Sequence, residues 1–242
     1  MDEFLHDTHA HIDLMPDPDA FVKEINRRRI YTIAVTNLPV LYQQLDQKLD
    51  SKFVRAALGF HPELMARFQA DIPQMWESLE KARYIGEVGI DLKVAKDSEA
   101  LQISFFTELI RRCHQLGGKI LTIHSRGASQ QVIDIIGPGF NGKFILHWYS
   151  GGLKTLEQAI NYGAFFSINY AMTCSPSGKR VIQMVPAERL LLESDAPFVT
   201  VKGKSHNTLS VAQIVKEIAF IKNISYPEIS SQLYQNFKNL IS

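Results

Sequence analysis

The segment that decides the fold runs from residue 100 to residue 137 and reads ALQISFFTELIRRCHQLGGKILTIHSRGASQQVIDIIG. Its first part carries apolar residues at three- and four-residue spacing, which predicts an amphipathic helix. The run KILTIH at 119–124 follows a glycine pair and predicts a buried strand, and a second helical pattern begins at residue 128. A strand between two helices favours a parallel sheet that helices cover.

The same alternation extends in both directions along the chain. Strands are expected near residues 4 (FLHDT), 31 (YTIAVT), 53 (FVRAAL), 83 (RYIGEVG), 119 (KILTIH), 143 (KFILHW), 164 (AFFSIN) and 189 (RLLLES). Helical patterns separate most of these runs, and two more occupy 210–223 and 226–241. Eight is the number of strands that closes a barrel, so the sequence predicts an α/β fold of the (β/α)8 TIM barrel type, with 1–242 as one domain. An open doubly wound sheet is the alternative, because counting strands does not prove closure.

Composition restricts the class of protein. A chain of 242 residues with 45% hydrophobic and 21% charged residues has the size and make-up of one α/β barrel. A net charge of +1 argues against a large nonspecific nucleic-acid surface. Two cysteines form no framework, so Cys113, expected on a helix, and Cys174, expected in a loop, are predicted to be free thiols. No leader and no apolar run of membrane length is recognisable, so a soluble, cytoplasmic protein without membrane contact is expected.

Candidate metal ligands occur where the predicted strands end. His9 and His11 stand two residues apart on extended chain, so both imidazoles point to one side. Further candidates at strand ends are His61, Glu87, His124, His147 and Asp195. Because the active site of a (β/α)8 barrel lies at the carboxyl ends of its strands, these side chains are expected to converge on one rim.

A single histidine in such a position is more often a packing or surface residue, and His6 and His114 are interpreted in that way. Five of the eight histidines, however, end predicted strands, and apolar strands have no packing reason to finish repeatedly in histidine. Imidazole and carboxylate ligands without thiolate suit Zn²⁺, Mn²⁺, Ni²⁺ or, more weakly, Mg²⁺. The sequence therefore predicts a site for two divalent metal ions.

Two carboxylates are predicted to take part in the chemistry. Glu87, on the fourth strand, is placed to bridge two ions, which a bridging carboxylate holds about 3.5–4 Å apart. A water bound there becomes an acidic nucleophile precursor near neutral pH. Asp195 is predicted to ligate one ion and to act as general base toward that water.

With these residues identified, the sequence resembles the TatD family of metal-dependent deoxyribonucleases, a branch of the amidohydrolase-like barrels. The resemblance runs almost end to end and rests on six ordered motifs. These are DTHAHID at 7–13, GFHP at 59–62, GEVGID at 86–91, IHSRGA at 123–128, HWYSG at 147–151 and ESDAP at 193–197. Six motifs in family order are far more specific than the D-x-H-x-H pair, which many amidohydrolases share.

The resemblance implies a role for each motif residue. The implied ligands are His9, His11, Glu87 and Asp195 for one ion, and Glu87, His124 and His147 for the other. It also implies that His61 lies beside the scissile phosphate with Arg126, and that Glu193 sits near the metals. The family fold is the TIM barrel, and its usual activity removes nucleotides from DNA ends, commonly 3′ to 5′.

The chain departs from the family pattern in HWYSG, in the serine of ESDAP and at Leu92-Lys93, and most tellingly in the loop 199–210, VTVKGKSHNTLS. The family usually places an arginine just before the asparagine that corresponds to Asn207, where this chain has KSH. Asn207 and Lys204 are expected to touch substrate rather than metal, so the departure concerns substrate choice. The short chain and this loop also resemble the TatD-like component of Qat anti-phage cassettes, which would imply a role in defence and protein partners from the cassette.

Three functions compete. The first is hydrolysis of phosphodiesters at DNA ends, in which Lys202 and Lys204 would position the backbone. Phe60, Trp148 and Tyr149 either stack bases in this reading or pack the wall of the barrel. The second is hydrolysis of a small amide, lactone or phosphoester by the same metals. The third is a binding subunit of a defence complex without catalysis, which would not need all six ligands. A monomer or weak oligomer is expected.

Overall fold

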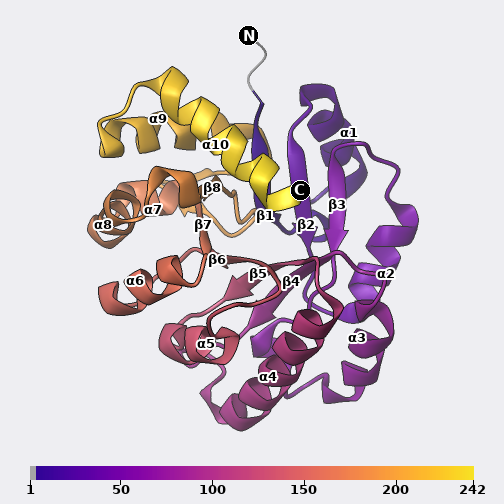
Figure 1. Ribbon diagram of the computed structural model, residues 1–242. Helices are drawn as coiled ribbons and strands as arrows, with labels where there is room; N and C mark the ends of the chain where they lie inside the picture. Colours follow the sequence, from indigo (N-terminus) through magenta and orange to yellow (C-terminus); the bar gives the residue numbers. More distant parts are fainter. Residues whose placement is uncertain (1–3) are drawn as a thin grey trace. The chain divides into compact units, whose positions relative to one another are not determined.

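The structure, a computed structural model, describes residues 4–242 (Figure 1). It confirms a strand in each of the eight predicted places. These are β1 (His6–Ala10), β2 (Tyr31–Val35), β3 (Val54–Ala57), β4 (Tyr84–Gly89), β5 (Lys119–His124), β6 (Gly142–His147), β7 (Phe165–Ile168) and β8 (Leu190–Leu192). Helices follow most strands, as the alternation predicts.

The helices include two that the sequence patterns did not indicate. The α-helices are α1 (Pro18–Arg28), α2 (Pro39–Lys48), α3 (Ile72–Leu79), α4 (Glu99–Leu116), α5 (Ser129–Ile136), α6 (Leu153–Asn161), α7 (Tyr170–Cys174), α8 (Pro176–Met184), α9 (Val211–Lys222) and α10 (Tyr226–Ile241). Short 3-10 turns are η1 (Ile12–Leu14), η2 (Pro62–Leu64), η3 (Gln69–Asp71), η4 (Lys96–Ser98), η5 (Ala187–Arg189) and η6 (Thr208–Ser210). Helix α2 buries little besides Pro39 and Tyr42, so its apolar stripe is weak. Helix α7 is too short to show a period, and Cys174, predicted in a loop, is its last residue.

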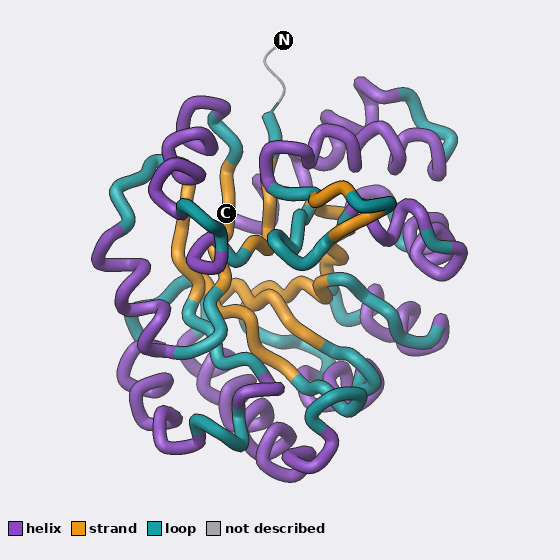
Figure 2. Tube along the Cα trace, turned by 180° about the vertical axis from the view of Figure 1, so that it is seen from behind, coloured by secondary structure: helices purple, strands orange, loops and turns teal. Residues whose placement is uncertain are grey.

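The loop after β8 is also more regular than its polar sequence indicated. It contains β9 (Thr200–Val201) and β10 (Lys204–Ser205), which pair antiparallel with Lys204 opposite Val201. Figure 2 shows this hairpin as a short pair of strands. Lys202 and Gly203 between the strands have φ of 50° and 74°, as in the two-residue turns that match strand twist.

The described chain forms two compact units. The first, here called the terminal unit, comprises the described residues up to Ala34, together with Leu49–Arg55 and Phe166–Ser242. The second, the central unit, comprises Val35–Lys48 and Ala56–Phe165.

In the central unit, β4, β5 and β6 are parallel neighbours. Tyr84 is in register with Ile120, and Lys119 with Gly142. The segment after β3 continues this arrangement, because the amide of Gly86 donates to the carbonyl of Leu58 at 2.8 Å. The strands are buried apolar runs, and α4 packs beside β4 and β5 and against α5, as expected for a parallel sheet under helices.

In the terminal unit, β1 pairs parallel with β2 and β7 pairs parallel with β8. Strand β1 also lies beside β8, since the Thr8 hydroxyl donates to the carbonyl of Leu192 at 3.0 Å. Helices α9 and α10 pack against each other and against β8. The side-chain amide of Asn236 on α10 donates to the carbonyl of Leu190 at 2.8 Å, which fixes the helix on the strand.

Two further properties concern the whole described chain. None of the helices within residues 4–242 is long and apolar enough to cross a membrane. Both cysteines are free thiols, as predicted: Cys113 is buried and Cys174 is exposed. Burial raises the pKa of the Cys113 thiol to about 12.

Candidate metal centre

The first group of predicted ligands lies in the central unit and is called the Glu87 cluster: Glu87, His61, His124 and His147. Glu87 is on β4, His124 ends β5 and His147 ends β6, so neighbouring parallel strands bring them together. One carboxylate oxygen, Oε1 of Glu87, lies 2.7 Å from Nδ1 of His124, 2.9 Å from Nε2 of His147 and 3.3 Å from Nε2 of His61. Glu87 is 3% exposed, so these contacts are largely shielded from water.

The spacing within the Glu87 cluster suits a divalent ion. Ligand atoms about 2.1 Å from one ion and at right angles to each other lie about 3 Å apart, which is the range found here. His61, Glu87 and His124 form a group whose ligand atoms all lie within 4.8 Å of one another. The donor set of imidazoles and a carboxylate fits Zn²⁺ and Mn²⁺, as the sequence indicated.

Glycine in the motif around Glu87 has a steric reason. Gly89 has a φ of 141°, and a Cβ there would lie 2.0 Å from the carbonyl oxygen of His124. Any larger residue would push β5 away from β4 and separate His124 from Glu87.

Asp91 belongs to this site, although its sequence position did not predict a role for it. Its Oδ2 lies 2.8 Å from Nε2 of His124, and its Oδ1 accepts from the amides of Lys93 and Val94. Burial alone would raise the pKa of Asp91, but the hydrogen bonds from His124 and the two amides hold it well below its usual value. The signal was present in GEVGID, whose aspartate follows Glu87 by four residues.

His124 is thereby held between two carboxylates. Burial by itself would lower the pKa of His124, yet the hydrogen bonds to Asp91 and Glu87 raise it. With Asp91 at Nε2, the ring keeps its proton on that nitrogen and turns Nδ1 toward Glu87. Histidines that bind metals are commonly oriented by a carboxylate on the other nitrogen in this way.

His61 has a different hydrogen-bonding state. Its Nδ1 accepts from the amide of Glu63 at 3.2 Å, so that nitrogen carries no proton. The proton of the neutral ring is then on Nε2, which points at Oε1 of Glu87. A ring in this tautomer offers a hydrogen-bond donor rather than a lone pair to whatever occupies the site.

The second group of predicted ligands lies in the terminal unit and is called the Asp195 cluster: His9, His11 and Asp195. Oδ1 of Asp195 lies 3.7 Å from Nε2 of His9 and 3.7 Å from Nε2 of His11. All three residues are at least 95% buried. Asp195 has a left-handed backbone with φ of 48°, and its amide donates to the carbonyl of His9 at 2.8 Å. The backbone bond holds Asp195 beside the end of β1.

Asp7 accepts hydrogen bonds from the chain segments that carry the Asp195 cluster. Its Oδ1 accepts from the amides of His9 and Ser194, at 3.1 and 2.9 Å, and its Oδ2 accepts from the hydroxyl of Thr208 at 2.7 Å. Burial raises the pKa of Asp7 to about 6, although hydrogen bonds from Ser194 and Thr208 oppose the shift. Asp7 therefore fixes the backbone on both sides of the cluster.

The remaining predicted residues are placed as follows. Glu193 is fully buried and accepts hydrogen bonds from the hydroxyl of Ser167 and, at 2.9 Å, from the side-chain amide of Asn169. Asn207 caps η6, where its side chain accepts from the amide of Leu209. Lys204 and Arg126 are exposed.

The aromatic residues next to the motifs divide into two kinds. Phe60 is fully buried, with its ring packed edge-on against Phe105 at 5.4 Å. Tyr149 is 2% exposed and donates its hydroxyl to the carbonyl of Gly152. These two rings pack the wall and are not available to stack bases, whereas Trp148 is 37% exposed.

Comparison with known proteins gives a consistent result. The family model for TatD related DNase matches residues 6–242. YabD of Bacillus subtilis (strain 168), named an uncharacterized metal-dependent hydrolase, is 26% identical over 252 residues and covers 98% of each chain. A protein of Erwinia amylovora named 3′-5′ ssDNA/RNA exonuclease TatD is 22% identical over 242 residues and covers 93% of each chain. The crystal structure of YJJV, a TatD homolog from Escherichia coli K12, aligns with a TM-score of 0.82 at 20% identity, over 99% of this chain and 98% of that one.

The structural likeness confirms the predicted fold class, the α/β barrel of the TIM type. With imidazole and carboxylate groups that fit metal ions, the chain is a metal-dependent hydrolase that acts on ester bonds. It belongs to the TatD family of deoxyribonucleases.

Proposed function

We propose that the protein is a two-metal phosphodiesterase that removes nucleotides from the ends of DNA. One ion would be held by His9, His11, Glu87 and Asp195, and the other by Glu87, His124 and His147. The observation that carries the proposal is the convergence of three imidazole nitrogens on Oε1 of Glu87. Family membership supports the remaining ligands, His9, His11 and Asp195, because the strands of a (β/α)8 barrel end at one rim.

Each residue of the site has a separate role in the proposed hydrolysis. Two divalent ions, when bound, would lower the pKa of a water and balance the charge of a phosphate oxygen. Asp195 would accept the proton of that water as general base, and Glu87 would hold the two ligand groups at a fixed distance. His61, with its proton on Nε2, would donate to a phosphate oxygen, and exposed Arg126 would add positive charge. Glu193, which accepts hydrogen bonds from Ser167 and Asn169, would line the site near the metals. Asn207 and Lys204 would contact the substrate.

The test is metal-dependent cleavage of end-labelled DNA. Purified protein is incubated with single- and double-stranded DNA in Mg²⁺, Mn²⁺, Zn²⁺ or Ni²⁺, with either the 5′ or the 3′ end labelled. A ladder that shortens from one end establishes an exonuclease and its polarity. Asp195→Asn should lower the rate by several orders of magnitude, since the base is lost, while Asp97→Asn, at an exposed aspartate, should leave it unchanged.

The other outcomes are informative. Full metal content without cleavage of any DNA would reject the proposal and favour a small amide, lactone or phosphoester as substrate, or a binding subunit that needs a partner. A role in anti-phage defence, with protein partners from the same cassette, is still a prediction. A plating assay of phage on cells that carry wild type or Asp195→Asn would test it.

A further inference from the structure

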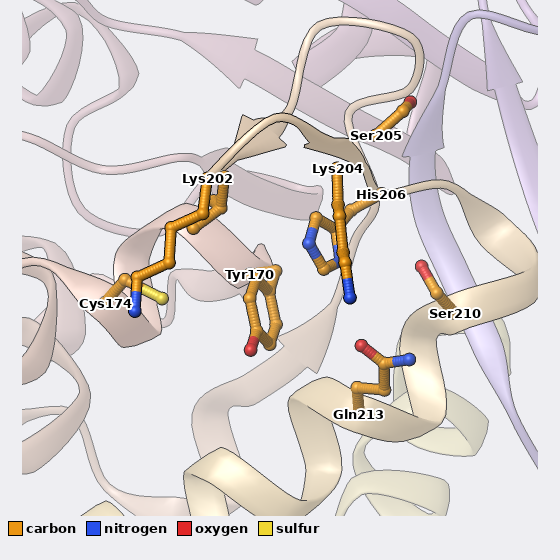
Figure 3. A pocket seen from close by; sticks show the side chains of 9 residues that line it. Tyr170, Cys174, Lys202, Lys204, Ser205, His206, Ser210 and Gln213 are labelled. Atoms are coloured by element: carbon orange, nitrogen blue, oxygen red, sulfur yellow. The ribbon is translucent and has the colours of Figure 1, made fainter.

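A pocket in the terminal unit, separate from the two ligand clusters, has about 350 Å³ of space. It lies between the β9–β10 hairpin, helix α7 and the start of helix α9 (Figure 3). Its lining residues are Tyr170, Cys174, Val201, Lys202, Lys204, Ser205, His206, Ser210 and Gln213. Five of these residues, from Val201 to His206, belong to the loop 199–210, in which this chain lacks the usual arginine of the family.

The wall of the pocket is rich in hydrogen-bond donors and positive charge. Lys202 and Lys204 contribute two ammonium groups, and none of the described residues that line the pocket is Asp or Glu. In Figure 3 both lysine side chains extend from the hairpin toward the helices, with Tyr170 between them in this view. Ser205 and Gln213 add a hydroxyl and an amide. A wall of this kind favours an anion.

The aromatic floor of the pocket is a stacked pair of rings. The ring of Tyr170 stacks on His206 with 4.0 Å between ring centroids and 14° between planes. His206 is 8% exposed, and its backbone amide donates to the carbonyl of Val199 at 2.9 Å. Burial and then the charge of Lys204 lower the pKa of His206, which favours the neutral ring as the partner of Tyr170.

The hairpin fixes where the lysines stand. Lys202 occupies the first position of a tight turn with φ of 50°, a position that favours Asn, Asp or Gly. Lys204 follows Gly203 directly and begins β10. A lysine held in an unfavourable backbone region points to a use for its side chain at that place.

The pocket is joined by short segments to the candidate catalytic residues. Helix α7 begins directly after Asn169, whose side chain donates to Glu193 at 2.9 Å. Strand β9 begins five residues after Asp195, and the amide of Phe198 between them donates to the carbonyl of Asp195 at 2.8 Å. Asp195 and the pocket are therefore close along the chain.

We propose that this pocket binds a backbone phosphate of the nucleic-acid strand, upstream of the end that is cleaved. Lys202 and Lys204 would supply charge, and the hydroxyl of Tyr170 would donate to a phosphate oxygen. The inference rests on the proposed function for the identity of the ligand. The binding itself does not depend on hydrolysis, so the two are tested separately.

The experiment measures binding of a strand to the full-length, metal-loaded protein. The probe is a fluorescein-labelled oligothymidylate of about ten nucleotides with phosphorothioate linkages, which slow cleavage. Fluorescence anisotropy gives the affinity of wild type and of Lys202→Ala/Lys204→Ala at several salt concentrations. Loss of the contact to one phosphate of a single strand makes the slope of log K against log salt less steep by about 0.7, so the double variant should differ from wild type by about 0.7.

The matched control is Lys23→Ala/Lys179→Ala, which removes the same charge from exposed positions on α1 and α8. It should keep the wild-type slope. Tyr170→Phe, which keeps the ring on His206, should weaken binding severalfold without changing the slope. If the double variant in the pocket and the control double variant have the same slope, the proposal is wrong.

A free phosphate is the other source of this ligand chemistry. Titration with inorganic phosphate, followed by displacement of the labelled strand, distinguishes the two. Tight phosphate binding that depends on Lys202 and Lys204 but does not displace the strand would overturn the strand assignment. If the strand binds as expected but no DNA is cleaved, the proposed function is rejected, and the assignment of the pocket as a phosphate-binding site is kept.

Discussion

Replacing Asp91 with asparagine should weaken metal binding while it leaves the fold almost unchanged. The carboxylate of Asp91 accepts the Nε2 proton of His124 at 2.8 Å, which leaves Nδ1 of that ring facing Glu87. An asparagine whose carbonyl still accepts from Lys93 and Val94 must present its NH₂ to His124. The ring then moves its proton to Nδ1 and loses the lone pair that would bind an ion.

The size of the effect follows from the position of Asp91 behind a candidate ligand. Loss of such an orienting carboxylate typically costs 10–100-fold in metal affinity, or about 1.4–2.7 kcal/mol. Asp91→Ala should cost the same affinity and also stability. It leaves the part-buried hydrogen bonds from the amides of Lys93 and Val94 without their acceptor, at about 1–3 kcal/mol for a group that water does not reach and less for one that it does.

Two measurements separate these effects. Calorimetric titration of the metal-free protein with Mn²⁺ or Zn²⁺ gives the affinities, and urea unfolding of the metal-free protein gives the free energies of unfolding. Asp97→Asn serves as control, because this aspartate is exposed on η4. Wild-type affinity in Asp91→Asn would refute the reasoning, since His124 would then be oriented without the carboxylate.

Three further predictions concern other parts of the chain. Glu87→Ala should lower the metal content from two ions per chain, measured by elemental analysis, because both ions lose a ligand; unchanged stoichiometry would exclude the bridging role. Burial lowers the pKa of His6 from 6.5 to about 3, so the unfolded chain binds a proton that the folded chain does not between these pH values. The free energy of unfolding should therefore fall more steeply in wild type than in His6→Gln as the pH drops below 6.5, by up to about 1.4 kcal/mol per pH unit, as pH-dependent urea unfolding would show; equal slopes would contradict it. In native protein an aromatic disulfide reagent should titrate one thiol, the exposed Cys174, and reach the buried Cys113 only on unfolding; two fast thiols would show that α4 opens readily.

The repeating strand and helix patterns predicted the barrel because each depends on local spacing. Lys119–His124 is an apolar run between two amphipathic helices, and the structure has β5 with these bounds. Helix α2 escaped prediction because it buries too little to show a stripe, and α7 because one turn shows no period. Candidate ligands could be named for a related reason: a histidine at the end of an apolar strand has no packing purpose.

The sequence by itself determined the residue types, their order and the strand ends on which they stand. Only the tertiary structure decided which groups share a proton or a hydrogen bond. That Asp91 orients His124, that Phe60 is buried, and that Lys202 and Lys204 flank a pocket all depend on contacts between segments distant along the chain. Such contacts are set by packing, which no local pattern of residues encodes.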